Sequence, residues 1–192
     1  KESLGEIMPQ QSILVTGGAG YIGSICVERL LAEGYTVTVM DNLSVGHRAA
    51  VAPEAAFHQA DIGDLGALRM ILQQAEPQTI LHFAGSALVG ESMEQPLKYF
   101  QNNTANGLAL LHCAAEFGVG KFIFSSTCST YGIPKTIPIN EETPQNPVNP
   151  YGESKLMFER MLQWHAKQSG TEAVILRYFN AAGATPQFGE YH

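Results

Sequence analysis

The stretch Thr16-Gly17-Gly18-Ala19-Gly20-Tyr21-Ile22-Gly23 decides the fold. The aliphatic run 13–15 before it is typical of a buried strand, and the segment 21–33 after it has helical periodicity, with Ile22, Cys26 and Leu30 on one face. Glycines let the backbone turn tightly beside a pyrophosphate, and the following helix directs free N–H groups at it. With 19 glycines, such spacing arises by chance about 0.2 times per chain. Its place between a strand and a helix therefore makes it informative.

Short β-branched runs alternate with helical-period stretches along the rest of the chain. This alternation predicts an α/β fold, a Rossmann-like doubly wound parallel sheet with helices on both faces. The expected strands are 13–15, 36–40, 55–60, 79–83, 122–125 and 173–178. The expected helices are 21–33, one marked by Leu65, Leu68 and Leu72, 97–117 and 151–168. The proline-rich segment 132–150 and the tail 181–192 are expected to be loops.

Length and composition narrow the class of protein. The 192 residues are 45% hydrophobic, enough for one domain at 12–192, with 1–11 an N-terminal lead that is disordered or foreign to the fold. A net charge of −7 argues against nucleic acid as a partner, and no stretch is apolar enough for a membrane span. Three cysteines without a C-x-x-C pair predict neither a disulfide framework nor a thiolate metal site. We expect a cytoplasmic protein without a metal.

Carboxylates follow two of the expected strands. Asp41 ends the second strand, where an acid accepts hydrogen bonds from adenosine ribose hydroxyls and repels a 2′-phosphate, which favours NAD over NADP. His47 and Arg48 are close enough in sequence to leave NADP open. Asp61-Ile62 either meets the adenine edge or simply ends the third strand, and both interpretations stay open.

The fourth expected strand ends in Phe83-Ala84-Gly85, whose small residues permit close approach of a dinucleotide. His82, just before them, is expected to be a core histidine and not a ligand.

Tyr151 and Lys155 lie one turn apart on the helix that Pro150 begins. A free phenol is only about 0.1% ionised at pH 7, but an ammonium about 5 Å away contributes roughly 3 kcal/mol to ionising it. The pair therefore predicts a tyrosine whose pKa the lysine lowers, acting as a proton acceptor. The hydroxyl cluster Ser125-Ser126-Thr127 ends the fifth strand, where it can hold a substrate oxygen.

Together, these motifs resemble the extended short-chain dehydrogenase/reductase family. Within it, several stretches resemble the UDP-glucose 4-epimerases: His82 to Gly85, Val89-Gly-Glu-Ser92, Asn102-Asn103, Phe124-Ser-Ser-Thr127, Tyr131-Gly132 and Arg177-Tyr-Phe-Asn180-Ala-Ala-Gly183-Ala. The likeness runs from about residue 12 to residue 192.

The resemblance implies NAD-dependent interconversion of UDP-glucose and UDP-galactose through transient oxidation at sugar C4. Tyr151 is then the proton acceptor, Lys155 holds the nicotinamide ribose, and Thr127 bonds the reacting oxygen. Phe179 lies against cofactor and sugar, and Asn180 meets the nucleotide phosphates. The full expected cofactor set is Gly17, Gly20, Tyr21, Ile22, Gly23, Asp41, Asn42, Leu43, Ser44, Asp61, Ile62, Phe83, Ala84, Gly85, Asn102, Tyr151, Lys155 and Phe179. The expected substrate set is Thr127, Tyr151, Phe179 and Asn180.

Two alternatives remain open: another nucleotide-sugar enzyme such as a 4,6-dehydratase, and a non-catalytic NAD-binding module. A dehydratase needs an Asp-Glu pair where Thr127-Cys128-Ser129 stands, and a module has no use for Tyr151 and Lys155. Ser86-Ala87 stands where some epimerases carry a lysine that contacts the cofactor.

The resemblance also bears on what this chain does alone. The family continues into a smaller C-terminal domain that closes over the nucleotide-sugar. We therefore expect residues 1–192 to bind cofactor with little turnover. The expected helices 97–117 and 151–168 resemble those through which the family forms dimers, with Met161 or Trp164 at the interface, although core packing explains them equally well.

Overall fold

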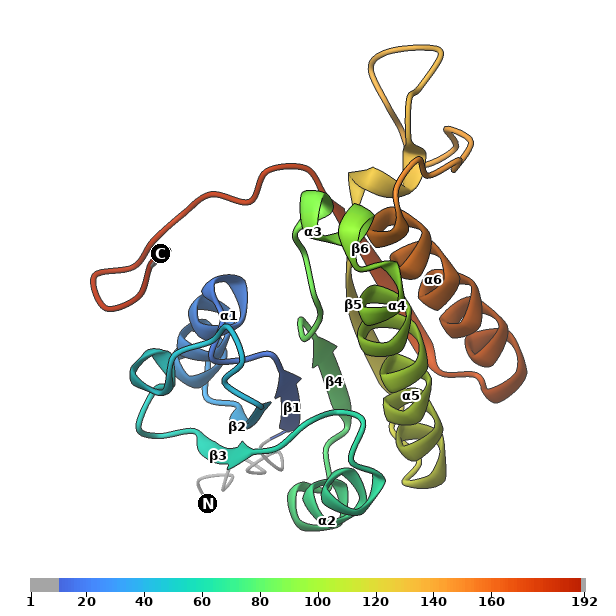
Figure 1. The fold of residues 1–192 in the computed structure, drawn as a ribbon. Helices are drawn as coiled ribbons and strands as arrows, with labels where there is room; N and C mark the ends of the chain where they lie inside the picture. Colours follow the sequence, from blue (N-terminus) through green and yellow to red (C-terminus); the bar gives the residue numbers. More distant parts are fainter. Residues whose placement is uncertain (1–10, 191–192) are drawn as a thin grey trace, which may run out of the picture.

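A computed structural model describes residues 11–190, so all but the last residue of the expected lead lies outside the described part. Six parallel strands form one sheet in the order β3-β2-β1-β4-β5-β6 (Figure 1). The strands are β1 (Ser12–Thr16), β2 (Thr36–Asp41), β3 (Ala56–Gln59), β4 (Thr79–His82), β5 (Lys121–Thr127) and β6 (Glu172–Tyr178). The predicted doubly wound parallel sheet is confirmed.

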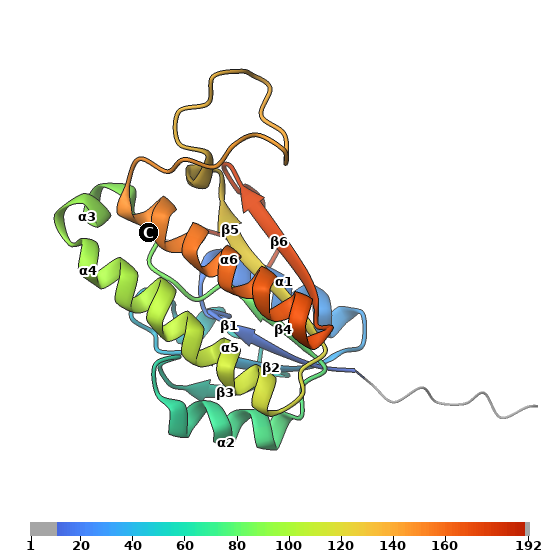
Figure 2. The ribbon, with the colours of Figure 1, turned by 90° about the vertical axis from the view of Figure 1, so that its right-hand side faces the viewer.

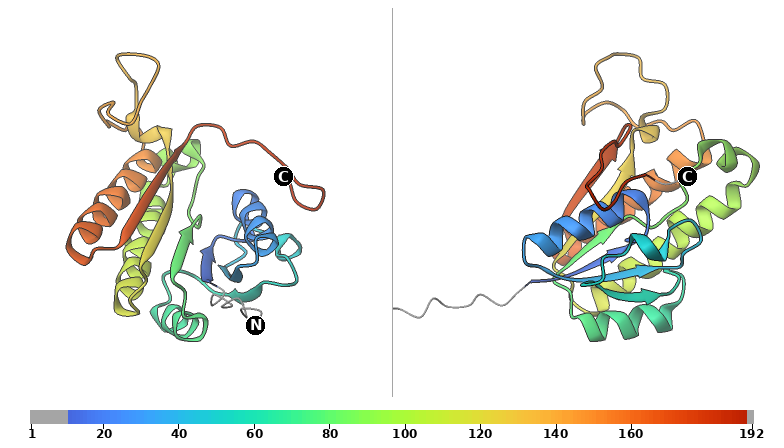
Figure 3. Two further views of the ribbon diagram at one scale, coloured as in Figure 1. Left: turned by 180° about the vertical axis from the view of Figure 1, so that it is seen from behind. Right: turned by 90° about the vertical axis from the view of Figure 1, so that its left-hand side faces the viewer.

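Helices cover both faces of the sheet. They are α1 (Tyr21–Ala32), α2 (Leu65–Ala75), α3 (Val89–Glu94), α4 (Pro96–Tyr99), α5 (Asn106–Glu116) and α6 (Pro150–Ser169). Short helical turns occupy Arg48–Ala50, Phe100–Ala105 and Cys128–Tyr131. Figure 2 shows α5 and α6 side by side across one face, and Figure 3 shows α1 on the other.

Each face of the sheet has its own apolar core. On one side, α2, α5 and α6 pack Leu68, Leu110 and Phe158 against strand residues such as Phe124. On the other side, α1 packs Val27 against Val15 and Val39 of the central strands. The central strands β1, β2 and β4 are buried on both faces and read as continuous hydrophobic runs, which explains why the sequence pattern identified them.

Strand order reverses between β1 and β4, because β2 and β3 extend to one side of this pair while β5 and β6 extend to the other. In open parallel sheets, the crevice beyond the carboxyl ends of the strands at such a reversal is where ligands bind. The glycine-rich turn, Asp41 and the Phe83–Gly85 stretch all follow strands that end at this edge.

The buried face of α1 differs from the one expected. Gly23, Ser24 and Val27 are buried, whereas Ile22 and Cys26 are only half-buried. A Cβ at Gly23 would overlap the carbonyl oxygen of Gly17. The small residues therefore let the helix approach the glycine turn closely, and this contact sets its rotation.

The expected helix 97–117 is interrupted. It consists of α4, a π-helical turn at Phe100–Ala105 and α5, and α3 before it was not predicted. A π turn admits an extra residue, and such turns often occur at functional sites. Here the side chain of Asn103 in that turn bonds both backbone groups of Ser86, with Oδ1 accepting from N–H (2.8 Å) and Nδ2 donating to the carbonyl (3.0 Å).

The remaining connections match the expectation of irregular structure. After the short turn at Cys128–Tyr131, residues 132–149 contain neither helix nor strand, and α6 begins at Pro150 with the Asn149 side chain accepting from Gly152 N–H at 2.8 Å. Within residues 11–190, no helix is long and apolar enough to cross a membrane, and no cluster of three metal-ligating side chains occurs.

Candidate active site

The glycine-rich turn connects β1 to α1 at the point where the strand order reverses. Gly17 N–H donates to the Met40 carbonyl (2.9 Å), and Gly20 N–H donates to the Gly17 carbonyl (3.2 Å). Gly17 has φ +76°, and a Cβ there would overlap the Ala84 backbone nitrogen. Only glycine satisfies both the conformation and the close approach to β4.

The turn leaves an anion site at the start of α1. In the described chain, Gly20 caps this helix with no side-chain hydrogen bond, and the first turn has no acidic residue. A Cβ at Gly20 would meet only the Gly17 carbonyl oxygen, at 3.4 Å, so the space above it is open. The positive end of the helix dipole and its free N–H groups therefore face space into which a pyrophosphate fits.

Asp41 lies at the end of β2 with 9% of its surface exposed. Its Oδ2 accepts from Ala19 N–H (3.0 Å) and its Oδ1 from Leu43 N–H (2.8 Å). A carboxylate has about four acceptor positions, so two remain for a ribose diol. These bonds also fix the carboxylate against the glycine turn.

Asp61 is held beside the same groove. Its Oδ2 accepts from Asn42 Nδ2 (2.7 Å), and its Oδ1 accepts from Gly63 N–H (2.7 Å). Arg48 lies over the Phe57 ring, 4.5 Å from its centroid, and does not line the groove. The nearest groove charges are therefore acidic, an environment that suits NAD better than a 2′-phosphate.

A first cavity of about 160 Å³ lies along this edge. Its lining includes eleven expected residues: Gly17, Gly20, Asp41, Asn42, Ser44, Asp61, Ile62, Phe83, Ala84, Gly85 and Asn102. It also includes residues that the sequence did not single out for the site: Met40, Val45, Gly46, Ala60 and Ser86.

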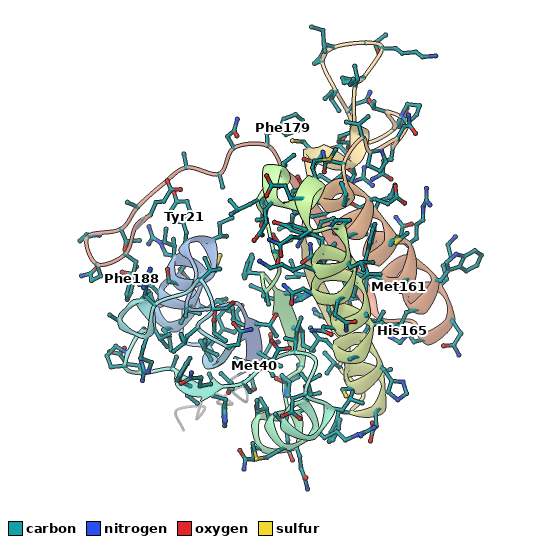
Figure 4. The ribbon with its side chains drawn as sticks, in the orientation of Figure 1. Tyr21, Met40, Met161, His165, Phe179 and Phe188 are labelled. Atoms are coloured by element: carbon teal, nitrogen blue, oxygen red, sulfur yellow. The ribbon has the colours of Figure 1, made fainter. Side chains whose placement is uncertain are left out.

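A second cavity of about 310 Å³ continues from the first, sharing Gly17, Gly20, Phe83 and Gly85 with it. The further expected residues that line it are Tyr21, Ile22, Gly23, Thr127, Tyr151, Lys155 and Phe179. Figure 4 shows Tyr21 on α1 and Phe179 after β6. Because the two cavities share four lining residues, they adjoin, and we call them together the groove.

Tyr151 lies in the first turn of α6, half-buried, with its ring 6.2 Å from that of Tyr99 in an edge arrangement. Burial raises the pKa of Tyr151, a hydrogen bond with Thr127 lowers it, and neighbouring Cys128 raises it. The net direction is upward. The expected lowering of this pKa by Lys155 is therefore wrong for the protein without cofactor: Lys155 is not among the groups that shift it, and burial of the phenol dominates.

Lys155 is buried, and burial lowers its pKa to about 8. Its ammonium donates to the Ser125 carbonyl (3.1 Å) and lies 5.0 Å from the centroid of the Phe124 ring. A Cβ at Gly85 would lie 3.1 Å from its Nζ, so the glycine keeps the space beside the ammonium open. The cation thus lines the second cavity beside Gly85, a residue that both cavities share.

Asn103 is the main site-supporting residue for which the sequence predicted no role. It is buried, and besides its two bonds to Ser86 its Nδ2 donates to Ser154 Oγ at 3.0 Å, next to Lys155. The sequence signal was the Asn102-Asn103 pair in the expected helix. Asn103 lies four residues after Tyr99 and four before Gly107, which are both buried, so its helical spacing also favours the inward face.

Two expected residues lie elsewhere. Leu43 packs against the α1-side core and contributes its N–H to Asp41, and Asn180 is exposed; neither lines the cavities. His82 is a core histidine, as expected: its Nδ1 lies 2.7 Å from Thr16 Oγ1, and its ring packs on Phe122, Phe124 and Phe158.

Comparison with known proteins agrees with this geometry. Residues 13–192 match the NAD dependent epimerase/dehydratase family. A UDP-glucose 4-epimerase of Streptococcus mutans is 52% identical over 185 residues, covering 94% of this chain and 56% of the relative.

Solved structures give the same result. A crystal structure of a UDP-glucose 4-epimerase superposes with a TM-score of 0.92 at 49% identity, and that of the Brucella ovis enzyme in complex with NAD with 0.91 at 44%. Each alignment covers 95% of this chain and 56% of the other. The chain spans little more than half the length of these relatives, and it belongs to the NAD dependent epimerase/dehydratase family, as its resemblance to the extended short-chain dehydrogenase/reductases predicted.

Proposed function

We propose that this chain is the NAD-binding part of a UDP-glucose 4-epimerase. The observation that carries the proposal is the meeting of Thr127, Tyr151 and Lys155 in a cavity continuous with the groove beside Asp41. A second support is that the similar proteins described above are named UDP-glucose 4-epimerases.

NAD, when bound, supplies a reversible hydride acceptor for the sugar carbon. The glycine turn and α1 would hold its pyrophosphate, Asp41 the adenosine ribose, and Lys155 the second ribose. Thr127 would fix the C4 hydroxyl of the sugar beside Tyr151, which accepts its proton and later returns it. Phe83 and Phe179 would exclude water from the reacting end of the groove.

The electrostatics of the groove support a dependence on cofactor. Since burial raises the pKa of Tyr151, the phenol stays protonated at neutral pH until further positive charge arrives. A cationic nicotinamide beside it would supply that charge. Proton transfer is thereby tied to the oxidised cofactor.

Two measurements test the proposal. Calorimetric titration of residues 1–192 with NAD should show one site, while this chain alone should give little turnover. The full-length protein should convert UDP-galactose to UDP-glucose, and Tyr151→Phe should lower kcat by about 10²- to 10⁴-fold without loss of NAD binding.

Tyr35→Phe, a change away from both cavities, is the matched control and should leave kcat unchanged. Formation of a 4-keto-6-deoxy sugar would favour the dehydratase instead. NAD binding by a full-length protein that turns over no UDP-hexose would favour the non-catalytic module.

We also propose that the protein is a homodimer through the outer face of α5 and α6. A hollow of about 440 Å³ lies there, lined by residues that include Leu108, Met161 and Trp164, with Trp164 71% exposed. Figure 4 shows Met161 and His165 on α6. Sedimentation should show that Trp164→Glu lowers the dimer fraction, whereas Met70→Glu on α2 should not.

The compartment we propose is the cytoplasm. Cys26, Cys113 and Cys128 form no disulfide, which suits a reducing environment. The proposed cofactor and substrate are charged molecules that do not cross membranes freely, so the enzyme is expected in the compartment that holds them.

A further inference from the structure

A buried ion pair lies one helical turn beyond Lys155 on α6. Glu159 is fully buried, and Arg177 of β6 reaches it with three short contacts. Arg177 Nε donates to Oε1 at 3.1 Å and to Oε2 at 3.2 Å, and Nη2 donates to Oε2 at 2.9 Å. This forked geometry fixes both side chains in one orientation.

Two further segments bond to the same carboxylate. The Ser126 hydroxyl on β5 donates to Glu159 Oε1, and Gln145 Nε2 in the irregular segment 132–149 donates to Oε2 at 2.9 Å. Arg177 Nη1 also donates to the Tyr131 hydroxyl at 2.9 Å. One carboxylate thus joins α6, β5, β6 and the segment 132–149.

Two of these connections, Ser126 and Arg177, are adjacent in the chain to site residues. Ser126 lies between Ser125, whose carbonyl accepts from Lys155, and Thr127, which lines the second cavity together with Tyr151. Arg177 precedes Tyr178 and Phe179, which line the second cavity.

The helix adds a second connection. Tyr151, Lys155 and Glu159 are spaced i, i+4 and i+8 on α6, so they share one helix face. A shift of β5 or β6 against α6 would change both the Ser125–Lys155 and the Thr127–Tyr151 contacts.

Stability alone does not explain this arrangement. A buried ion pair is often no more stabilising than apolar residues of similar size, because desolvation of the charges offsets their attraction. The pair instead fixes the positions of α6, β5, β6 and the segment 132–149 relative to one another. Catalytic rates are sensitive to such placement, since a displacement of about 1 Å costs about 100-fold.

We propose that Glu159, with Arg177, is a positioning residue for the epimerase reaction, acting through Ser126 on Thr127 and Lys155. The proposal rests on the function proposed above. Neither side chain contacts the reacting atoms; they fix the end of β5 against α6.

The test uses the full-length protein with NAD. Glu159→Gln keeps the size and an acceptor for Ser126 but removes the charge that orients Arg177. We expect kcat to fall about 10- to 100-fold while KM for the UDP-hexose and NAD affinity change less than about threefold. Ser126→Ala, which removes only one hydrogen bond, should lower kcat in the same direction.

A double variant separates positioning from stability. Glu159→Met with Arg177→Met replaces the pair by apolar side chains and should restore much of the melting temperature lost in Glu159→Gln, but not kcat. The matched control is Glu172→Gln, which removes the exposed Lys121–Glu172 pair (3.4 Å) at the other end of the same two strands. It should leave kcat unchanged.

The outcomes distinguish the two proposals. A wild-type protein that binds NAD but does not epimerise overturns the function. If the wild type is active, the positioning role is overturned by either of two results. One is a Glu159→Gln variant with unchanged kcat and pH profile, and the other is a double variant with the kcat of the wild type. A readout independent of turnover is the absorbance titration of the Tyr151 phenol in the NAD complex, which Glu159→Gln should shift and Glu172→Gln should not; identical curves would also overturn it.

Discussion

Gly17 and Gly20 belong to one motif, but a methyl group would meet different surroundings at the two positions. At Gly17 it would overlap the backbone of Phe83 and Ala84, just after β4, and require φ +76°, whereas at Gly20 φ is −85° and the nearest atom lies at 3.4 Å. The first glycine is therefore required by the fold, whereas the space beside the second is open to a ligand.

This difference gives a prediction at the residue scale. Gly17→Ala should destabilise the chain by about 2 kcal/mol or more, because strain at positive φ and overlap add. Gly20→Ala should leave the melting temperature nearly unchanged and weaken NAD binding about tenfold or more, since the methyl group occupies the anion site. Thermal unfolding and calorimetry check both, and a Gly20→Ala protein with wild-type NAD affinity would contradict the assignment.

A second residue-scale prediction concerns Tyr151. Burial raises the pKa of its phenol in the protein without cofactor. Bound NAD, with its cationic ring, should lower this pKa by about two units. The phenolate absorbance of the wild type minus that of Tyr151→Phe measures it. NADH, whose ring is neutral, serves as the control and should shift the titration much less; equal shifts would argue against a ring beside the phenol.

At the scale of the elements, the helix from α4 to α5 contains a π turn that hydrophobic periodicity did not predict. Apolar spacing identified the helix but not the π turn at Phe100–Ala105, in which Asn103 bonds to Ser86, 17 residues earlier. The strands and the glycine turn were predictable because their signals are local. The bonds of Asn103 to Ser86 and the pairing of Glu159 with Arg177 were not, because both are tertiary contacts.

The prediction at the scale of the elements concerns the contribution of Asn103 to stability. Asn103→Ala removes one buried and two partly buried hydrogen bonds, including those to both backbone groups of Ser86, so we expect about 2 to 4 kcal/mol of destabilisation. Urea unfolding measures the change. Gln101→Ala, at an exposed position of the same turn, should cost less than about 0.5 kcal/mol; equal losses would show that the turn does not depend on Asn103.

For the whole molecule, His82 links folding to pH. Burial, with a smaller contribution from Lys155, lowers the pKa of His82 from its ordinary value of 6.5 to about 3. Between these two values the unfolded chain takes up a proton that the folded chain does not. This histidine therefore destabilises the fold by about 1.4 kcal/mol per unit as pH falls from 6.5.

We expect His82→Gln to lessen the loss of unfolding free energy between pH 6.5 and pH 5 by about 2 kcal/mol. Urea unfolding at the two pH values measures this difference. The exposed His112→Gln is the control and should retain the wild-type dependence. A wild-type slope in His82→Gln would mean that other groups control the acid sensitivity.

The sequence predicted most of the residues that line the groove. Of the 28 different residues that line the two cavities, eighteen were expected from motifs, most of them at strand ends. The pKa of Tyr151 was predicted in the wrong direction because sequence spacing gives the distance to a charge but not the burial of the phenol. Leu43 and Asn180 neighbour site residues in the chain but do not line the cavities: Leu43 packs against the core and Asn180 is exposed, so their predicted roles stay predictions.

The most direct test of the account is a crystal structure of the protein with NAD. It should show the pyrophosphate at the start of α1, Lys155 on the nicotinamide ribose and the nicotinamide ring facing the Tyr151 hydroxyl. A ring bound elsewhere, or a phenol turned away from it, would contradict the proposed chemistry.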